Sequence, residues 1–572
     1  MYVAGLTLEC AVPCHESEPM TKVASPACDK GADRHAFEPR SDIEPQIRTI
    51  DAALRSRAAK DPDAPFLKCG GRWTSAAELD GVSDGLAAGL AELGIRRGDR
   101  VATLCTNREE CIELMFASAK LGSILVPLNP FLRGEFLAYQ LADSGAKVVV
   151  TDAAGYQEVI SSPVGVLERI VLLDDVPAIG DATVSWGQLG ASRRQAPDVD
   201  LTPADLMAIM YTSGTTGLAK GCMLSHGYYT YYAAPWAERG WVIPGDRIFT
   251  AFPLFHSGAH MAVMFALMLE GASACIETSF SASTYISRAA EENATCLFGI
   301  GVHALAILRQ PARPSDGAHP FRIAGFPPMH PDDQDRFEDR FKTPVIAEGI
   351  GQTEITPGLL DYVEGPRRRG ANGRPCHHVD VELFDEHGLA VGDGEIGELV
   401  IRPKLPDAMF SGYWNKPEAT VHAWRGLWHH TGDYFTRDAE GFYTFVDRKA
   451  DALRRRGENI SSLQLEEAIA GHPKVAQVAV CAAPSELADI EIKACIIPIP
   501  GEEIDPGELF AFLKERLPYF AVPRYVEIRE SLPVTPATNR VQKAVLRAEG
   551  ITPGTWDLHR LGFAIGRDER RG

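Results

Sequence analysis

The chain has 572 residues, 45% of them hydrophobic, and a formal net charge of −20 from 57 basic and 77 acidic side chains. This length exceeds what one hydrophobic core supports and predicts two or more domains. The acidic balance argues against a basic face for nucleic acid or an anionic membrane, and no apolar run approaches the ~18 residues of a membrane span. Most of the twelve cysteines lie inside apolar runs, which is typical of reduced thiols in a cytoplasmic protein.

Residues 1–44 precede the first periodic segment, and we expect them to form a disordered extension. Their mildly apolar start lacks the basic n-region of a signal peptide. Cys10, Cys14 and His15 are candidate metal ligands, but no second pair follows at a useful spacing. An extension without a metal is therefore the preferred interpretation.

Predicted helices and strands alternate from Ser75 onward. Apolar residues at three- and four-residue steps predict helices that begin at Ser75, near Ile112 and near Arg133. Strands that alternate with helices predict an α/β fold with mostly parallel sheets covered by helices on both faces. The short apolar runs that predict strands are 101–105, 124–128, 148–151 and 206–210.

The stretch 211–221 follows the last of these strands and contains three glycines, four Ser or Thr hydroxyls and one lysine. Glycines let the backbone fold tightly with its N–H groups facing inward, and the hydroxyls and Lys220 add donors, so the composition predicts a phosphate-holding loop. It differs from the usual P-loop, which needs Gly directly before Lys, because Ala219 stands there. A flexible polar surface loop is the alternative interpretation.

Four further motifs follow in order: Glu348 to Glu354, Gly394 to Glu398, Thr431-Gly432-Asp433, and Phe445 to Arg448. Together with the stretch 211–221 they closely resemble the signature of the adenylate-forming superfamily, which comprises acyl-CoA synthetases, peptide-synthetase adenylation domains and beetle luciferases. The resemblance runs from about Gly98 to Arg547 and is closest to carnitine/crotonobetaine and fatty-acid-transport type ligases. It implies a large N-terminal ATP- and acyl-binding domain over 45–447 and a smaller, mobile α+β cap domain over 448–572.

The resemblance implies a site for Mg·ATP. Glu354, with Thr216, is expected to hold Mg²⁺, which takes hard oxygen ligands beside substrate phosphates, and Asp433 is expected to bind the ribose hydroxyls. Ile350 stands where relatives carry an aromatic residue that stacks on adenine, so two alternatives stay open: the nucleotide affinity is reduced, or Phe326 compensates. The expected ATP-binding residues are Thr212, Ser213, Gly214, Thr215, Thr216, Gly217, Lys220, Gly325, Phe326, Pro327, Gly349, Ile350, Gly351, Gln352, Thr353, Asp433, Phe445 and Arg448.

His256 occupies the position where peptide-synthetase adenylation domains place an aspartate for the α-ammonium of their substrate. An imidazole does not stabilise an ammonium, so α-amino acids are disfavoured. The residues expected around the acyl group are apolar or small, which suits a bulky apolar acid. The expected acyl-binding residues are His256, Met261, Phe265, Gly299, Ile300 and Gly301.

The cap domain carries three expected functions. Ala450 stands at the usual hinge position, and Arg456, Gly457 and Glu458 match the loop that forms the thiol tunnel for coenzyme A. The catalytic lysine of relatives is replaced by Arg540, and Lys543 follows three residues later. Arg540 is the preferred catalytic cation and Lys543 is the alternative; the other expected catalytic residues are Lys220 and Glu354.

These parts imply an AMP-forming acid–CoA ligase that activates a carboxylic acid as an acyl adenylate and transfers it to a thiol. The expected cofactors and partners are Mg²⁺, ATP, coenzyme A and a small-molecule acid, with no nucleic acid and a homodimer left open. Two alternatives stay open: an adenylation enzyme that loads a carrier-protein thiol, and a catalytically weak nucleotide-binding relative. A luciferase-like oxygenase is disfavoured.

Overall fold

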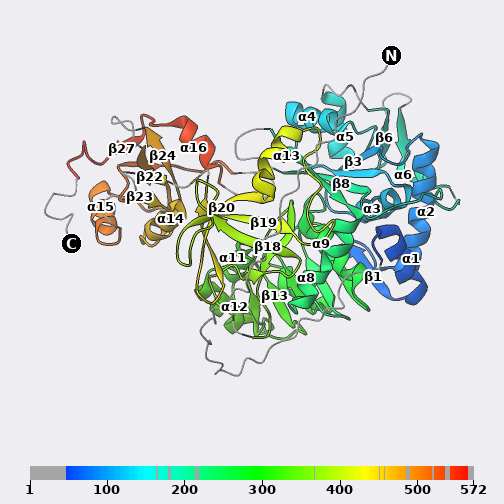
Figure 1. The fold of residues 1–572 in the computed structure, drawn as a ribbon, viewed down its shortest axis with the longest axis horizontal. Coiled ribbons are helices and arrows are strands. Elements are labelled where there is room, and N and C mark those ends of the chain that lie inside the picture. The colour runs from blue at the N-terminus through cyan, green and yellow to red at the C-terminus, as the bar shows by residue number, and fades with distance from the viewer. Residues whose placement is uncertain are drawn as a thin grey trace, which may run out of the picture. The chain divides into compact units, whose positions relative to one another are not determined.

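Two seven-stranded sheets dominate the computed structural model, which describes residues 47–563 except 163–164, 166, 178–181, 193, 213–217, 366, 450, 452, 456–457, 485–489, 518–520 and 535–540. The predicted extension at 1–44 lies outside the described residues. Most neighbouring strands in both large sheets are parallel, and helices connect them (Figure 1). The predicted α/β fold is confirmed.

The first sheet has the order β7-β6-β5-β3-β4-β8-β9 and is parallel except for the pair β8–β9. Its predicted strands are confirmed to within one or two residues. Its helix α2 begins where predicted, because Glu78 N–H donates to Ser75 Oγ and Ser75 N–H donates to the Glu78 carboxylate. Its elements are α2 (Ala76–Glu92), β3 (Arg100–Leu104), α3 (Glu109–Leu121), β4 (Ile124–Pro127), α4 (Gly134–Ser144), β5 (Val148–Thr151), α5 (Ala153–Ser161), β6 (Arg169–Leu172), β7 (Thr183–Ser185), α6 (Trp186–Leu189), β8 (Leu206–Thr212) and β9 (Lys220–Ser225).

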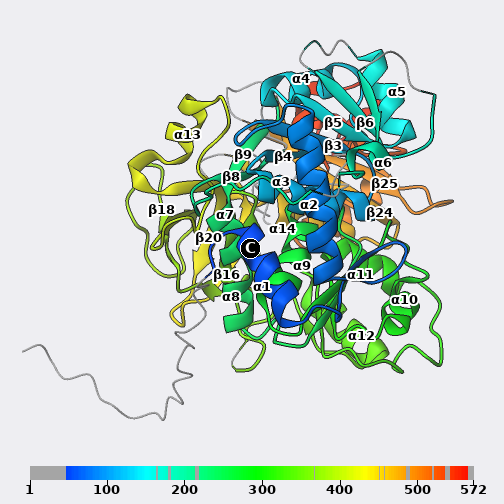
Figure 2. The same ribbon diagram turned by 90° about the vertical axis from the view of Figure 1, so that its right-hand side faces the viewer.

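The second sheet has the order β14-β13-β12-β10-β11-β1-β2, and only β2 is antiparallel to its neighbour. Helices α10, α11 and α12 lie together on one flank of the molecule (Figure 2). The parallel strands end along one edge, which in open α/β sheets is where ligands bind. Its elements are β1 (Pro65–Cys69), β2 (Thr74–Ser75), β10 (Arg247–Thr250), α9 (Ser257–Met268), β11 (Ser273–Ile276), α10 (Tyr285–Glu291), β12 (Cys296–Phe298), α11 (Gly301–Leu308), β13 (Ile323–Gly325), α12 (Pro331–Phe341) and β14 (Val345–Ile346).

Two antiparallel sheets follow along the chain. One has the order β15-β16-β17 and the other β18-β19-β20-β21. The elements of this region are β15 (Gly349–Gln352), β16 (Ile355–Leu360), β17 (Arg374–Pro375), β18 (Val379–Phe384), β19 (Gly397–Pro403), α13 (Pro417–Ala423), η1 (Arg425–Leu427), β20 (His429–Arg437) and β21 (Tyr443–Arg448); α1 (Ile50–Lys60), α7 (His226–Tyr231) and α8 (Ala233–Glu238) complete the part before residue 449.

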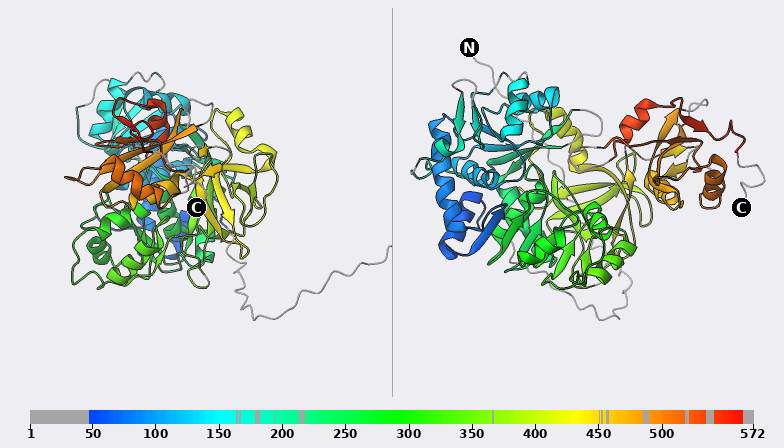
Figure 3. Two further views of the ribbon diagram at one scale, coloured as in Figure 1. Left: turned by 90° about the vertical axis from the view of Figure 1, so that its left-hand side faces the viewer. Right: turned by 180° about the vertical axis from the view of Figure 1, so that it is seen from behind.

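The C-terminal part has its own sheet, β24-β25-β26-β27, and its own hydrophobic core, which includes Leu465, Ile492 and Val526 (orange and red in Figure 3). The smaller α+β domain that the resemblance implied is confirmed; the boundary at residue 447 and the mobility of a cap stay predictions. Among the described helices, none combines the length and apolarity that a membrane crossing needs. The elements are β22 (Leu453–Arg455), β23 (Glu458–Ile460), α14 (Ser462–Ala470), β24 (Val475–Pro484), β25 (Ile490–Pro498), α15 (Pro506–Lys514), β26 (Tyr525–Ile528), α16 (Lys543–Glu549) and β27 (Thr555–Asp557).

Candidate active site

The predicted phosphate-holding loop is framed by the antiparallel hairpin β8–β9. Thr212 and Lys220 are paired across the two strands, so the two ends of the loop are fixed next to each other. The Tyr139 hydroxyl donates to the carbonyl oxygen of Ala219 at 2.9 Å and ties the loop's far end to α4. The predicted ligands Ser213, Gly214, Thr215, Thr216 and Gly217 lie outside the described residues.

Three predicted ATP-binding residues meet at one point, each from a different strand. Gln352 Nε2 donates to Asp433 Oδ2 at 3.0 Å and to the carbonyl oxygen of Thr431 at 3.0 Å. Arg448 Nε lies 2.9 Å from Asp433 Oδ1, and the two residues are paired in the β20–β21 ladder. Asp433 is 2% exposed, so its carboxylate is held in a defined orientation between an amide and a guanidinium.

A second predicted group forms around Glu354, which is buried. The Tyr413 hydroxyl donates to Glu354 Oε1 at 2.8 Å, and Lys220 Nζ lies 4.6 Å from the centre of the Tyr413 ring. Burial, with Glu354 as a further cause, raises the pKa of Tyr413, so its hydroxyl stays a donor at neutral pH. The Tyr228 hydroxyl donates to the carbonyl oxygen of Thr353 at 2.8 Å and fixes the backbone before Glu354.

The sequence motifs assigned no role to Tyr413 or Tyr228. Tyr413 stands in the run Gly412-Tyr413-Trp414, and nothing in the neighbouring sequence indicates a partner for its hydroxyl. Only the fold brings its hydroxyl to Glu354, because the two residues are 59 positions apart in the chain. Glu354 lies between β15 and β16, whereas Tyr413 lies before α13.

The donors around Glu354 fit Mg²⁺. Glu354 supplies one hard carboxylate oxygen donor next to the loop that is predicted to hold phosphates, and Mg²⁺ is usually held by one or two carboxylates plus substrate phosphates. In the described part of the chain, no group of three or more His, Cys, Asp or Glu side chains forms a protein-only metal cage. The second predicted ligand, Thr216, lies outside the described residues.

The adenine side differs from expectation at Phe326. This residue directly follows β13, but its side chain is 0% exposed and packs against Phe337 with ring centres 5.3 Å apart. With its side chain buried, Phe326 offers no face for an adenine ring, which disfavours compensation by this residue. The other alternative, a reduced nucleotide affinity, stays a prediction. Ile350 itself is partly exposed in β15, while Gly325 and Pro327 flank Phe326 in the chain.

The predicted acyl-binding residues divide between the strand edge and the core. Gly299, Ile300 and Gly301 connect the carboxyl end of β12 to α11. His256 caps α9, because Gly258 N–H donates to His256 Nδ1 at 3.2 Å, and burial lowers the pKa of the imidazole. Phe265 is 0% exposed and packs 5.5 Å from Phe298, which places it in the core rather than in a pocket wall.

Met261 lies one turn before Phe265 in α9 and is 5% exposed. It therefore contributes little surface to any pocket. Of the predicted acyl set, His256 and Ile300 are partly exposed, while Gly299 and Gly301 are buried at the carboxyl edge of the sheet.

Replacing Gly301 with alanine is expected to destabilise the protein and to lower its activity. An ideal Cβ on Gly301 would lie 1.9 Å from the carbonyl oxygen of Pro328, so α11 must shift away from the loop after β13. We expect a loss of about 2 kcal/mol in the free energy of unfolding, measured by denaturant titration.

Gly81→Ala is the matched control. Gly81 lies inside α2, and its Cβ would meet nothing within 4 Å. This substitution should stabilise the protein by about 0.5–1 kcal/mol, since alanine is the better helix former. Equal stability for both variants would contradict the close approach at Gly301.

The cap residues are only partly described. Lys543 begins α16, and its Nζ lies 2.7 Å from Glu466 Oε1 and donates to Ser462 Oγ at 2.5 Å. Lys543 is therefore helical and paired, and the choice between Arg540 and Lys543 as the catalytic cation stays a prediction. Arg540, Ala450, Arg456 and Gly457 lie outside the described residues, and only the backbone of Glu458, in β23, is described.

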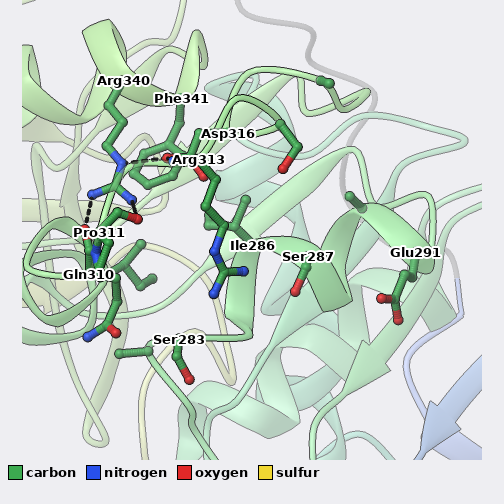
Figure 4. A pocket seen from close by; sticks show the side chains of 15 residues that line it. Ser283, Ile286, Ser287, Glu291, Gln310, Pro311, Arg313, Asp316, Arg340 and Phe341 are labelled. Carbon is green, nitrogen blue, oxygen red and sulfur yellow. Dashed lines mark hydrogen bonds and ion pairs between the residues drawn. The ribbon is translucent and has the colours of Figure 1, made fainter.

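A separate cavity of about 210 Å³ lies between α10, the segment after α11 and the end of α12 (Figure 4). Arg340 is fixed there by Asp316, with Nε 2.7 Å from Oδ2. The cavity includes no predicted site residue and touches the C-terminal end of α11, whereas Gly299 to Gly301 lie at the N-terminal end of that helix. We do not assign it to the reaction.

Two family models match this chain. The model of the AMP-binding enzyme family matches residues 54–414, and that of the AMP-binding enzyme C-terminal domain matches residues 464–538. A feruloyl-CoA synthase from Amycolatopsis sp is 34% identical over 495 residues, which cover 86% of this chain and 97% of the relative. A crotonobetaine/carnitine–CoA ligase from Salmonella paratyphi A is 31% identical over 82% of this chain and 92% of the relative.

Solved structures give the same result. An anthranilate CoA ligase in complex with anthranoyl-AMP superposes with a TM-score of 0.77 at 25% identity, over 88% of this chain and 98% of that one. A fatty acyl CoA synthetase from Mycobacterium tuberculosis gives a TM-score of 0.69 at 28% identity, over 88% and 98%. From the two matched family models and the near-complete coverage of these relatives, this chain belongs to the AMP-binding enzyme family.

Proposed function

We propose that this AMP-forming acid–CoA ligase activates a bulky apolar carboxylic acid as its acyl adenylate and transfers the acyl group to the thiol of coenzyme A. The observation that carries the proposal is the pair of clusters around Asp433 and Glu354. One suits a nucleoside and the other suits charged phosphates. Lys220, which pairs with Thr212 at the start of β9, joins the second cluster through the ring of Tyr413.

The cluster at Asp433 suits the ribose of ATP. A carboxylate can accept hydrogen bonds from two neighbouring hydroxyls, and Gln352 and Arg448 hold this one in place. Because these partners fix the carboxylate before ATP arrives, little conformational entropy is lost on binding. Phe445, one of the predicted residues, is held by its backbone N–H, which donates to Asn372 Oδ1 at 2.8 Å.

The cluster at Glu354 suits the triphosphate. Lys220 at the end of the hairpin loop provides a cation, and the backbone N–H groups of the loop are expected to provide further donors. Bound Mg²⁺ would neutralise part of the phosphate charge as pyrophosphate leaves. The acid's carboxylate can then approach the α-phosphorus, and positioning supplies much of the rate.

The acid is expected to enter at the carboxyl edge of the second sheet, beside Gly299 to Gly301. His256 there is neutral because burial lowers its pKa, so it offers no charge partner for an α-ammonium. The transfer to coenzyme A is assigned to the segment 456–458, and Arg540 is the proposed cation of the first step. We place the reaction in the cytoplasm, which suits the nine free cysteines of the described residues.

A screen of pyrophosphate release tests the function. Purified protein with Mg·ATP is given a panel of carboxylic and amino acids, with and without coenzyme A. We expect release that depends on an apolar acid, and acyl-CoA only when coenzyme A is present. Turnover of amino acids alone contradicts the substrate class, adenylate formation without any acyl-CoA indicates a carrier-protein acceptor, and no release with any acid contradicts the function.

A further inference from the structure

His303 has a buried polar atom that no described residue satisfies. It lies in the first turn of α11, where its backbone N–H donates to the carbonyl oxygen of Ile300 at 2.8 Å. Its Nδ1 is shielded from solvent and makes no hydrogen bond in the described part of the chain. Buried polar atoms without a partner are rare and costly, so each one calls for an explanation.

The surroundings of His303 make packing alone a poor explanation. Its ring is stacked on Phe280 with centres 4.2 Å apart and planes 19° apart, and Phe252 lies 6.0 Å away on another side. Burial lowers the pKa of His303 to about 4, so the imidazole is neutral at pH 7. A leucine or phenylalanine would fill a space between two phenyl rings without leaving a polar atom unpaired.

His303 lies near the carboxyl edge of the second sheet, where the acid is proposed to bind. Phe252, Phe280 and Gly299 each follow the carboxyl end of a strand of the second sheet, namely β10, β11 and β12. An ideal Cβ on Gly299 would lie 3.0 Å from His303 Nδ1, so this nitrogen faces the backbone of the predicted acyl segment.

We propose that His303 is a specificity-determining residue that forms a hydrogen bond with a hydroxyl group on the distal part of the acid. This inference rests on the proposed function and narrows its substrate class to an apolar acid that carries one hydroxyl. A hydroxyl both donates and accepts, so it can serve either tautomer of the neutral imidazole. Because Nδ1 is closed to solvent here, the acid must separate the imidazole from Gly299 as it enters.

The test compares acids that share a carbon skeleton and differ by one distal hydroxyl. The pairs are 4-hydroxycinnamic with cinnamic acid and 12-hydroxydodecanoic with dodecanoic acid, and the measured quantity is kcat/KM for pyrophosphate release. The protein is expected to prefer the hydroxylated member of at least one pair by about tenfold, the effect of one net hydrogen bond. No preference in either pair overturns the inference.

Three variants test whether the preference for the hydroxylated acid depends on His303. His303→Leu should reduce the preference to about one, with the loss confined to the hydroxylated acid. His303→Asn keeps a polar group near Nδ1 and should retain part of the preference. His387→Leu makes the same change at a histidine that is 75% exposed, and should leave the preference and the stability unchanged.

Three further outcomes separate a role in specificity from a role in packing and from a failure of the proposed function. If His303→Leu lowers kcat/KM equally for both members of a pair, His303 only packs and the inference is wrong. If His303→Leu does not fold, the preference for hydroxylated acids is still measured with the unmodified protein and with His303→Asn, and these two values test the inference. If no acid releases pyrophosphate, the proposed function fails instead, which is a different result from release without discrimination.

Discussion

Replacing Glu354 with glutamine is expected to reduce acid-dependent pyrophosphate release by about 10²- to 10³-fold. The change removes one charge that faces the phosphates and alters the volume very little. The protein should stay folded, because Tyr413 can still donate to the amide oxygen at the position of Glu354 Oε1. The measurement is the rate of release as a function of Mg²⁺ concentration, with thermal unfolding recorded in parallel.

Tyr413→Phe is the matched control for this prediction. It removes only the hydroxyl that orients Glu354 and leaves both the charge and the ring beside Lys220. We expect a loss of about tenfold, the effect of one net hydrogen bond. An unchanged rate for Glu354→Gln at limiting Mg²⁺ would contradict the assignment of this carboxylate to the metal.

Replacing Arg540 with alanine should slow acyl-adenylate formation by about 10²-fold or more, while thioester formation from supplied acyl adenylate is spared. Adenylation brings two anions together, and Lys543 is the other cation of that segment. In the structure, however, Lys543 is already paired with Glu466 and Ser462. The two half-reactions are measured separately, the first by pyrophosphate release and the second by acyl-CoA formation.

Lys543→Met is the comparison, and its effect should fall on stability. Burial raises the pKa of Glu466, and Lys543 counteracts that rise, so removing the lysine leaves a buried carboxylate without its cation. We expect a loss of about 3 kcal/mol in the free energy of unfolding and nearly normal adenylation at temperatures where the protein is folded. A selective loss of adenylation in this variant would identify Lys543 as the catalytic cation.

The helices and strands could be predicted from the sequence, and so could the site residues that stand in closely spaced motifs. Strands such as β5 and helices such as α2 follow from apolar periodicity and from the Ser75 cap, which are local properties. Gln352, Asp433 and Arg448 were predicted as one site, and the structure brings them together.

Side-chain direction could not be predicted, because it depends on what packs against each strand end. Phe326 was expected beside adenine, but α12 covers it through Phe337. His303 was not noticed at all, since a histidine in an apolar helix looks like core until its neighbours are known. Lys543 looked like a free cation because its partner Glu466 lies in another helix.

The strand β1 pairs in parallel with β11, so that Leu67 lies opposite Ala274, one strand in from the β2 edge of the second sheet. During synthesis, Phe66 and Leu67 therefore leave the ribosome long before their partner strand exists. The first sheet can assemble in the meantime, because its strands lie between these two segments in the chain. Nascent chains that stop before Ser273 should expose β1 and bind chaperones, whereas chains that extend well past Ile276 should bury it.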